Sequence, residues 1–200
     1  MKRLFAIPER LRELVPITAG AFVVLVVIGY VAGYLRPEAF TPLLDAFGEM
    51  VEDKGLLEAE GAELMTGILT NNLSALFLSM LLGLVPFIRL PAMELGLNAL
   101  LFGGMASYYR HEGLPLVAYL VGTLPHGITE LSALVLSCAG GLHLCKAVSD
   151  ALLRRGEKGS LRRAFGECML LYMRLIVPLL LVSAFIEAFV TPSLLNAFIE

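Results

Sequence analysis

The sequence predicts an all-α, polytopic helical membrane protein with about five spans. Of its 200 residues, 58% are hydrophobic and only 16% are charged. A soluble domain averages about half apolar and about a quarter charged residues. Two long segments, residues 14–35 and 64–88, contain no charged residue. Because about 20 apolar residues of helix cross the hydrocarbon core of a bilayer, each segment is long enough to span a membrane.

The charges between the predicted spans give the orientation. The expected spans are, in order, residues 15–35, 66–87, 92–108, 114–146 and 169–191. Residues 1–13 contain four Lys or Arg and residues 146–163 contain six, whereas residues 36–63 contain eight acidic residues against two basic ones. Because basic residues near span ends stay in the cytoplasm, we expect a cytoplasmic N-terminus, an external 36–63 segment and an external C-terminus.

The predicted organisation is one short segment followed by one transmembrane domain. Residues 1–14 form a basic segment that lies in the cytoplasm or at the membrane interface. Residues 15–200 form a single transmembrane helical domain in the cell membrane. Within it, residues 38–62 place acidic residues on one face and apolar residues on another, which predicts an amphipathic external helix. No cleavable signal peptide is expected, because residues 14–35 exceed the length of a signal-peptide core, about 7–15 residues.

Six polar side chains within the predicted spans are candidates for a polar cluster inside the bundle. They are Asn71, Asn72, Asn98, His126, Glu130 and Glu187. An ionisable group at the centre of a bilayer costs about 2.5–3.5 kcal/mol on insertion scales, so such groups face protein or water. We therefore expect these six side chains to face the interior of the bundle, most of them in one connected polar cluster.

The fourth apolar region is too long for one straight crossing. Its 33 residues from 113 to 145 would reach about 50 Å as a continuous helix. Pro125 removes a backbone donor and Gly127 adds backbone freedom, so we predict that the span breaks near Pro125. His126 and Glu130 are four residues apart, which places them on one helix face.

Three interpretations of this polar cluster stay open. The side chains can fix helix packing through hydrogen bonds, they can line a path for protons or substrate, or they can bind metal. A metal site is not predicted, because His126 and Glu130 supply two ligands and zinc takes three or four. No zinc-protease, P-loop or nucleophile-elbow motif occurs in the sequence. We therefore expect no enzymatic activity, no catalytic residue and no cofactor.

Four motifs resemble, in order, those of the stage II sporulation protein M family. They are ILTNNLSALFLSMLLGLVP at 68–86, NALLFGG at 98–104, LPHGITELSALVLSCAGGLHL at 124–144 and LVSAFIEAFVTPSL at 181–194. The positions that fit are Asn71, Asn72, Asn98, Pro125, His126, Gly127, Glu130, Ile186, Glu187 and Pro192. The chain departs from the family pattern at Thr129, where an aromatic residue is frequent, and at Ser132, where proline is frequent.

The resemblance implies a multi-pass membrane protein that anchors partners. In spore formers this family acts in engulfment, as a membrane anchor for partners that degrade peptidoglycan. We therefore expect a non-enzymatic membrane scaffold that contacts the lipid bilayer, forms a homodimer, positions peptidoglycan hydrolases or other membrane partners, and binds no nucleic acid. Two alternatives remain. One is a transporter or permease component whose basic 146–163 loop docks a cytoplasmic ATPase. The other is an intramembrane enzyme that uses Glu130 or Glu187 as base, with His126 as acid/base partner.

Overall fold

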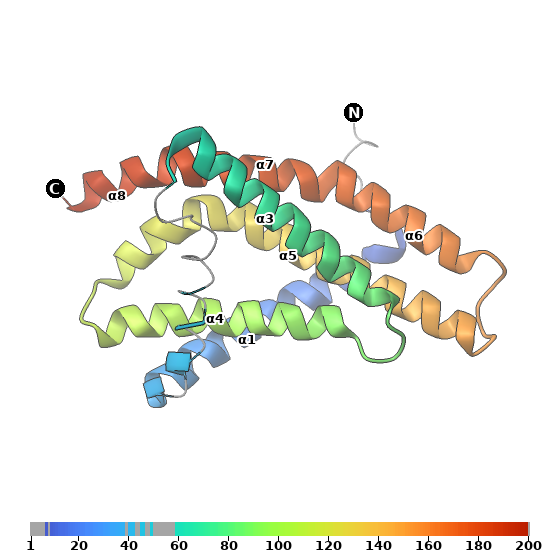
Figure 1. Cartoon of the computed structure of the whole chain (residues 1–200). Coiled ribbons are helices and arrows are strands. Elements are labelled where there is room, and N and C mark those ends of the chain that lie inside the picture. The colour runs from blue at the N-terminus through green and yellow to red at the C-terminus, as the bar shows by residue number, and fades with distance from the viewer. Residues whose placement is uncertain are drawn as a thin grey trace.

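The computed structural model describes residues 7, 9–38, 40–42, 45, 46, 49 and 59–199, and the elements in this part of the chain are helical (Figure 1). The α-helices are α1 (Leu14–Leu35), α3 (Gly61–Leu81), α4 (Leu90–His111), α5 (Leu116–Leu152), α6 (Ser160–Leu171), α7 (Val177–Phe185) and α8 (Thr191–Ile199). Two short 3-10 helices are η1 (Glu9–Leu11) and η2 (Leu82–Leu84). Two π-helical segments, η3 (Tyr172–Ile176) and η4 (Ile186–Val190), join α6, α7 and α8 into one helical stretch.

The predicted all-α class is confirmed for the described residues, and its helices are compatible with a membrane protein. Four described helical stretches are long and apolar enough to cross a bilayer, namely Leu14–Leu35, Gly61–Leu84, Leu116–Leu152 and Ser160–Leu195. The predicted span at 92–108 forms α4, which has 22 residues but is less apolar because it carries polar residues such as Glu94 and Asn98. A count of five spans is therefore not confirmed, and the side on which the N-terminus lies stays a prediction.

Helix α5 is the centre of the bundle. It packs against α1, α3, α4, α6, α7 and α8, and Figure 1 shows it running between the other helices. Every residue from 133 to 141 on α5 is buried. A helix that is buried on all sides must be apolar all round, and this requirement explains why small and aliphatic residues fill this part of the sequence.

The prediction that the fourth span breaks near Pro125 is not confirmed. Residues 116–152 form one helix that contains Pro125, and Figure 1 shows that α5 changes direction where its colour passes from lime to yellow. Proline removes one helical hydrogen bond and its ring pushes on the preceding turn, which kinks a helix without ending it when the neighbours hold both sides. The two limbs of α5 are held in this way, because each packs against other helices of the bundle.

Helices α1 and α4 approach each other through glycines. A Cβ added at Gly103 would lie 2.1 Å from the carbonyl oxygen of Val26, and one at Gly29 would lie 2.6 Å from that of Leu100. Gly33 is also buried, and its nearest neighbours are Ser107 and Gly104. Small residues allow such close contact of membrane helices. This contact uses Gly29 and Gly33 within one chain, and the homodimer remains a prediction.

Two sequence predictions concern segments that the structure describes only in part. Most of the predicted external helix, residues 38–62, lies outside the described residues, and so do residues 1–6 and 8 of the basic segment. Within the basic segment, the structure describes η1, and Leu11 of this short helix is fully buried against the bundle core. The external helix and the position of the basic segment at the membrane therefore stay predictions.

Candidate functional site

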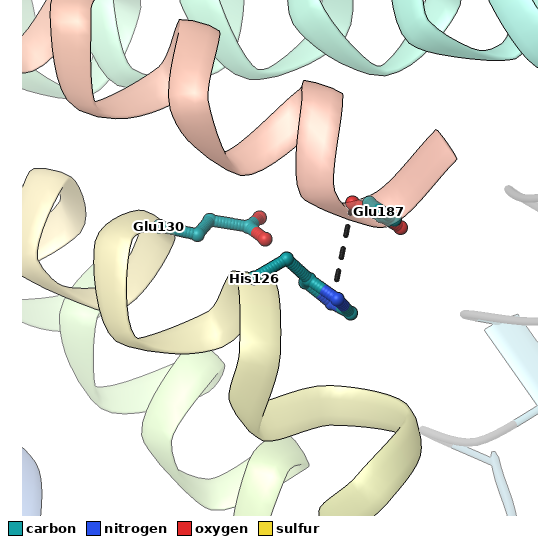
Figure 2. A group of neighbouring side chains, drawn as sticks. All are labelled: His126, Glu130 and Glu187. Atoms are coloured by element: carbon teal, nitrogen blue, oxygen red, sulfur yellow. Dashed lines mark ion pairs between the residues drawn. The ribbon is translucent and has the colours of Figure 1, made fainter. Parts of the chain in front are cut away.

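Two helices of the bundle bring three ionisable side chains together. Figure 2 shows His126 and Glu130 projecting from α5 toward the π-helical segment η4, which carries Glu187. One ligand atom from each of these side chains lies within 4.8 Å of the other two. All three residues are partly buried. His126 and Glu130 meet on one face because they are one helical turn apart, as the sequence predicts.

The imidazole of His126 lies between α5 and the C-terminal helices. Its Nε2 is 4.0 Å from Oε2 of Glu187, and its Nδ1 is 3.3 Å from Oγ1 of Thr191. The backbone carbonyl of His126 accepts a hydrogen bond from Oγ of Ser183 at 3.1 Å. These contacts fix the position of the ring relative to the helix that carries Glu187.

The carboxylate of Glu130 is connected to α3 through two asparagines. Nδ2 of Asn72 donates to Oε1 of Glu130 at 3.1 Å, and Nδ2 of Asn71 donates to Oδ1 of Asn72 at 3.1 Å. The chain of hydrogen bonds therefore runs from Asn71 to Glu130. Five of the six polar residues singled out in the sequence lie in this region, where the structure brings residues of α3, α5 and η4 together.

Asn98 is the member of the predicted set that does not join this hydrogen-bonded group. Its side chain is exposed, and its Nδ2 donates to the backbone carbonyl of Glu94 on the same helix at 3.0 Å. It nevertheless lines the same pocket as His126 and Glu130. Asparagine often bonds to the preceding turn of its own helix, so its presence in a span did not require a partner on another helix.

Sequence reasoning missed two hydroxyl residues of the site, Ser183 and Thr191. Both are buried, with 0% and 6% of their surface exposed, and both contact His126. Serine and threonine are common in membrane helices, where they bond to their own backbone, so their type gives no signal. The spacing of Thr191 does give one, because it lies four residues after Glu187.

A pocket of about 480 Å³ opens beside the three ionisable side chains. It lies between α4, α5, η4 and α8, and aliphatic and aromatic residues form much of its wall. The lining includes Leu101, Phe102, Met105, Tyr109, Tyr119, Leu131 and Leu195. Its polar groups converge at His126, Glu130 and Glu187. A concave, mostly apolar cavity of about 300–1,000 Å³ with a few convergent polar groups is typical of small-ligand sites.

The fold and this pocket together define a helical membrane-type protein with a polar site inside its bundle. The chain matches the Stage II sporulation protein M family over residues 17–192, which is most of its length. It belongs to this family, and the resemblance found in the sequence motifs is confirmed.

The chain is similar to one curated protein and to no solved structure. The chain is 35% identical over 131 residues to an uncharacterized protein of Methanocaldococcus jannaschii, a match that covers 64% of this chain and 70% of that protein. No solved structure matches the chain. Because this relative is itself uncharacterized, its similarity indicates no activity for the chain.

Proposed function

We propose that this protein is a transporter or permease component and that its pocket is the substrate site. The observation that carries the proposal is that the cavity reaches His126, Glu130 and Glu187. Protein interiors are packed to crystal-like density. A polar cluster that served packing alone would be enclosed by side chains, and this one lies on the wall of an open pocket.

The chemistry of the pocket supports the same proposal. Carboxyl and imidazole groups inside a membrane span are costly unless they face protein or water, and they mark ion and substrate paths in many membrane proteins. Here they lie on helices that belong to candidate spans. The apolar wall and the polar end together fit a small molecule or ion better than a large polar substrate.

The proposal is tested by the access of water to the pocket. Thr123 lines the cavity, whereas Ile128 on the same helix is 65% exposed at the outer surface of the bundle. A thiol reacts with a polar, membrane-impermeant reagent only where water lets it ionise. We expect Thr123→Cys in sealed membrane vesicles to be modified from one side, and Ile128→Cys to stay unmodified.

The unmodified chain gives the background of this experiment, because its three cysteines, Cys138, Cys145 and Cys168, are buried. Reaction of both variants after denaturation verifies that each thiol is present. A Thr123→Cys protein that reacts only after denaturation would show a pocket without water access from either side, and the transport proposal would then fail.

A second candidate function, a membrane scaffold that positions envelope partners such as peptidoglycan hydrolases, is favoured by the family membership. The structure is compatible with this role. The connections η2–α4, α4–α5 and α5–α6 are short, which leaves residues 36–63 and the two ends as the main regions for contact outside the membrane. Neither proposal requires enzymatic activity.

Co-purification from native membranes separates the two candidates. The scaffold proposal predicts that a cross-linked, affinity-purified chain recovers an envelope hydrolase, and that Glu130→Gln recovers it equally well because the pocket is not needed. Recovery of a cytoplasmic ATPase instead would support the permease proposal. The scaffold proposal fails if no stable partner is recovered with the wild-type chain.

A further inference from the structure

We infer that His126, Glu130 and Glu187 bind one divalent metal ion of the zinc or manganese type. The sequence supplied two of these ligands on one helix, and the fold adds Glu187 as a third from a different helix (Figure 2). The inference deepens the proposed function, because the role of the ion rests on the transport proposal. Metal binding itself can be measured on protein that transports nothing.

The distances come close to those of one shared ion. Zinc binds histidine nitrogen and carboxylate oxygen at about 2.0–2.2 Å, so two ligand atoms on one tetrahedral ion lie about 3.3–3.6 Å apart. The atoms of this group lie within 4.8 Å of one another, and Nε2 of His126 is 4.0 Å from Oε2 of Glu187. These separations are larger than that, so the glutamate side chains would have to rotate for all three residues to coordinate one ion.

The charges favour a cation at this position. Among the residues that the structure describes, no lysine or arginine forms an ion pair with Glu130 or Glu187. Two ionised carboxylates close together repel each other, and a buried charge is costly unless it is paired or bound to a metal. A divalent cation between them would balance both charges at once.

The ligand types limit the class of cation. Imidazole nitrogen suits zinc, iron, nickel and copper, whereas carboxylate oxygen suits magnesium, calcium and manganese. A set of one nitrogen and two carboxylates therefore fits zinc, which accepts both ligand types, or manganese. The pocket beside the three side chains leaves space for a water or substrate as the fourth ligand, which is the arrangement of non-structural zinc sites.

Neighbouring residues hold two of the ligands in place. Asn72 donates to one oxygen of Glu130 and leaves the other free. Nδ1 of His126 contacts the hydroxyl of Thr191, so Nε2 is the nitrogen that faces Glu187. Metal-binding histidines and carboxylates are oriented by hydrogen bonds of this kind, and loss of such a partner costs about 10–100-fold in metal affinity.

A second pair in the molecule shows what distinguishes this group. Nε2 of His143 lies 3.0 Å from Oε2 of Glu167, so these two residues close on each other directly. Within the described ranges, His126, Glu130 and Glu187 form the one group of three neighbouring side chains that could bind a metal ion. The His143–Glu167 pair is therefore a suitable internal control.

The test measures metal binding by the full chain in detergent. After tag removal and metal stripping, zinc and manganese are titrated by equilibrium dialysis with elemental analysis. We expect one equivalent bound by the wild type and none by Glu187→Gln or His126→Asn. Asn72→Ala should bind about 10–100-fold more weakly. Glu94→Gln and Glu167→Gln, which alter other partly buried carboxyl groups, should bind as the wild type does.

Cobalt replaces zinc for a spectroscopic check of the ligands. The expected spectrum shows coordination by nitrogen and oxygen, and thiolate bands from the three cysteines would contradict the assignment. Equal binding by the wild type and Glu187→Gln, or no binding by a folded wild type, would overturn the inference. Matching thermal unfolding of the metal-free variants and wild type verifies that a loss of binding is not a loss of fold.

The outcome is separable from that of the transport proposal. A wild type that binds one metal ion while Thr123→Cys stays unreactive would keep the metal site and end the transport proposal. A reactive Thr123→Cys in a chain that binds no metal would keep a water-accessible pocket and end the metal inference.

Discussion

Replacement of Gly83 by alanine is expected to destabilise the protein by about 3 kcal/mol, the upper end of the usual cost of overpacking. A Cβ at this position would lie 2.0 Å from the carbonyl oxygen of Gly141 and 2.6 Å from its carbonyl carbon. Both neighbours are backbone atoms of the buried central helix, so no side-chain rotation can relieve the overlap. Segment η2 would have to move away from α5, and the packing of α3 and α4 on either side would loosen.

Gly166→Ala is the matched control for this change. Gly166 lies in the exposed part of α6, and a Cβ there would meet no atom within 4 Å. Alanine is favoured over glycine in helices by about 0.8–1.0 kcal/mol, so this variant should be as stable as the wild type or slightly more so. Denaturant titration in mild detergent measures both. Equal stability of Gly83→Ala and Gly166→Ala would contradict the close approach of η2 and α5.

Replacement of Glu130 by alanine is expected to destabilise the protein by about 1–3 kcal/mol, the cost of leaving a buried partner without its hydrogen bond. The partner is Asn72, whose Nδ2 donates to Glu130 at 3.1 Å. Glu130→Gln keeps an oxygen that can accept this bond, so it should retain most of the stability. It also removes an ionisable carboxyl group from the bundle, and it should abolish binding at the proposed metal site.

A double-mutant cycle with Asn72→Ala isolates the pair. If the hydrogen bond stabilises the fold, the cost of Glu130→Ala should be smaller in the Asn72→Ala background than in the wild type. Thermal unfolding in detergent gives the free energies. Additive effects of the two substitutions would show that Glu130 and Asn72 do not interact in the folded protein.

The sequence predicted the class of fold and the family better than the arrangement of helices. Composition and long uncharged segments are enough to identify membrane helices, because the bilayer sets one length and one polarity for every span. They are not enough to classify α4. This helix pairs with α1 through Gly29 and Gly103, and it carries the polar residues Glu94 and Asn98.

Within the candidate site, the sequence predicted the spacing on one helix and a gathering of polar side chains inside the bundle, but not which side chains meet between helices. The spacing of His126 and Glu130 places them on one face whatever the rest of the chain does. Nothing local relates them to Glu187, which is 57 residues beyond Glu130, because the distance between two helices is decided by packing. For the same reason the sequence indicates two candidate metal ligands, whereas the fold brings three such side chains together.

Pro125 illustrates a prediction that the structure does not confirm. A proline inside a helical segment reads as a break from sequence alone, since its missing donor is certain and its surroundings are unknown. In the folded chain, both limbs of α5 are packed against other helices, and the helix bends instead of ending. A break of the span near Pro125 is therefore not confirmed, because the helix continues through this residue.

The π-helical segment η4 has a consequence for how the site tolerates change. A π turn accommodates one more residue than an α turn, and each residue of a regular helix rotates the next side chain by about 100°. The extra residue is therefore absorbed within η4, and the directions of the flanking helices α7 and α8 are kept. Loss of a single residue between Glu187 and Thr191 would return the segment to an α turn and would leave Thr191 facing nearly the same way. The site is thus less sensitive to the loss of one residue inside η4 than a site on regular α-helix, where each residue turns the next side chain by about 100°.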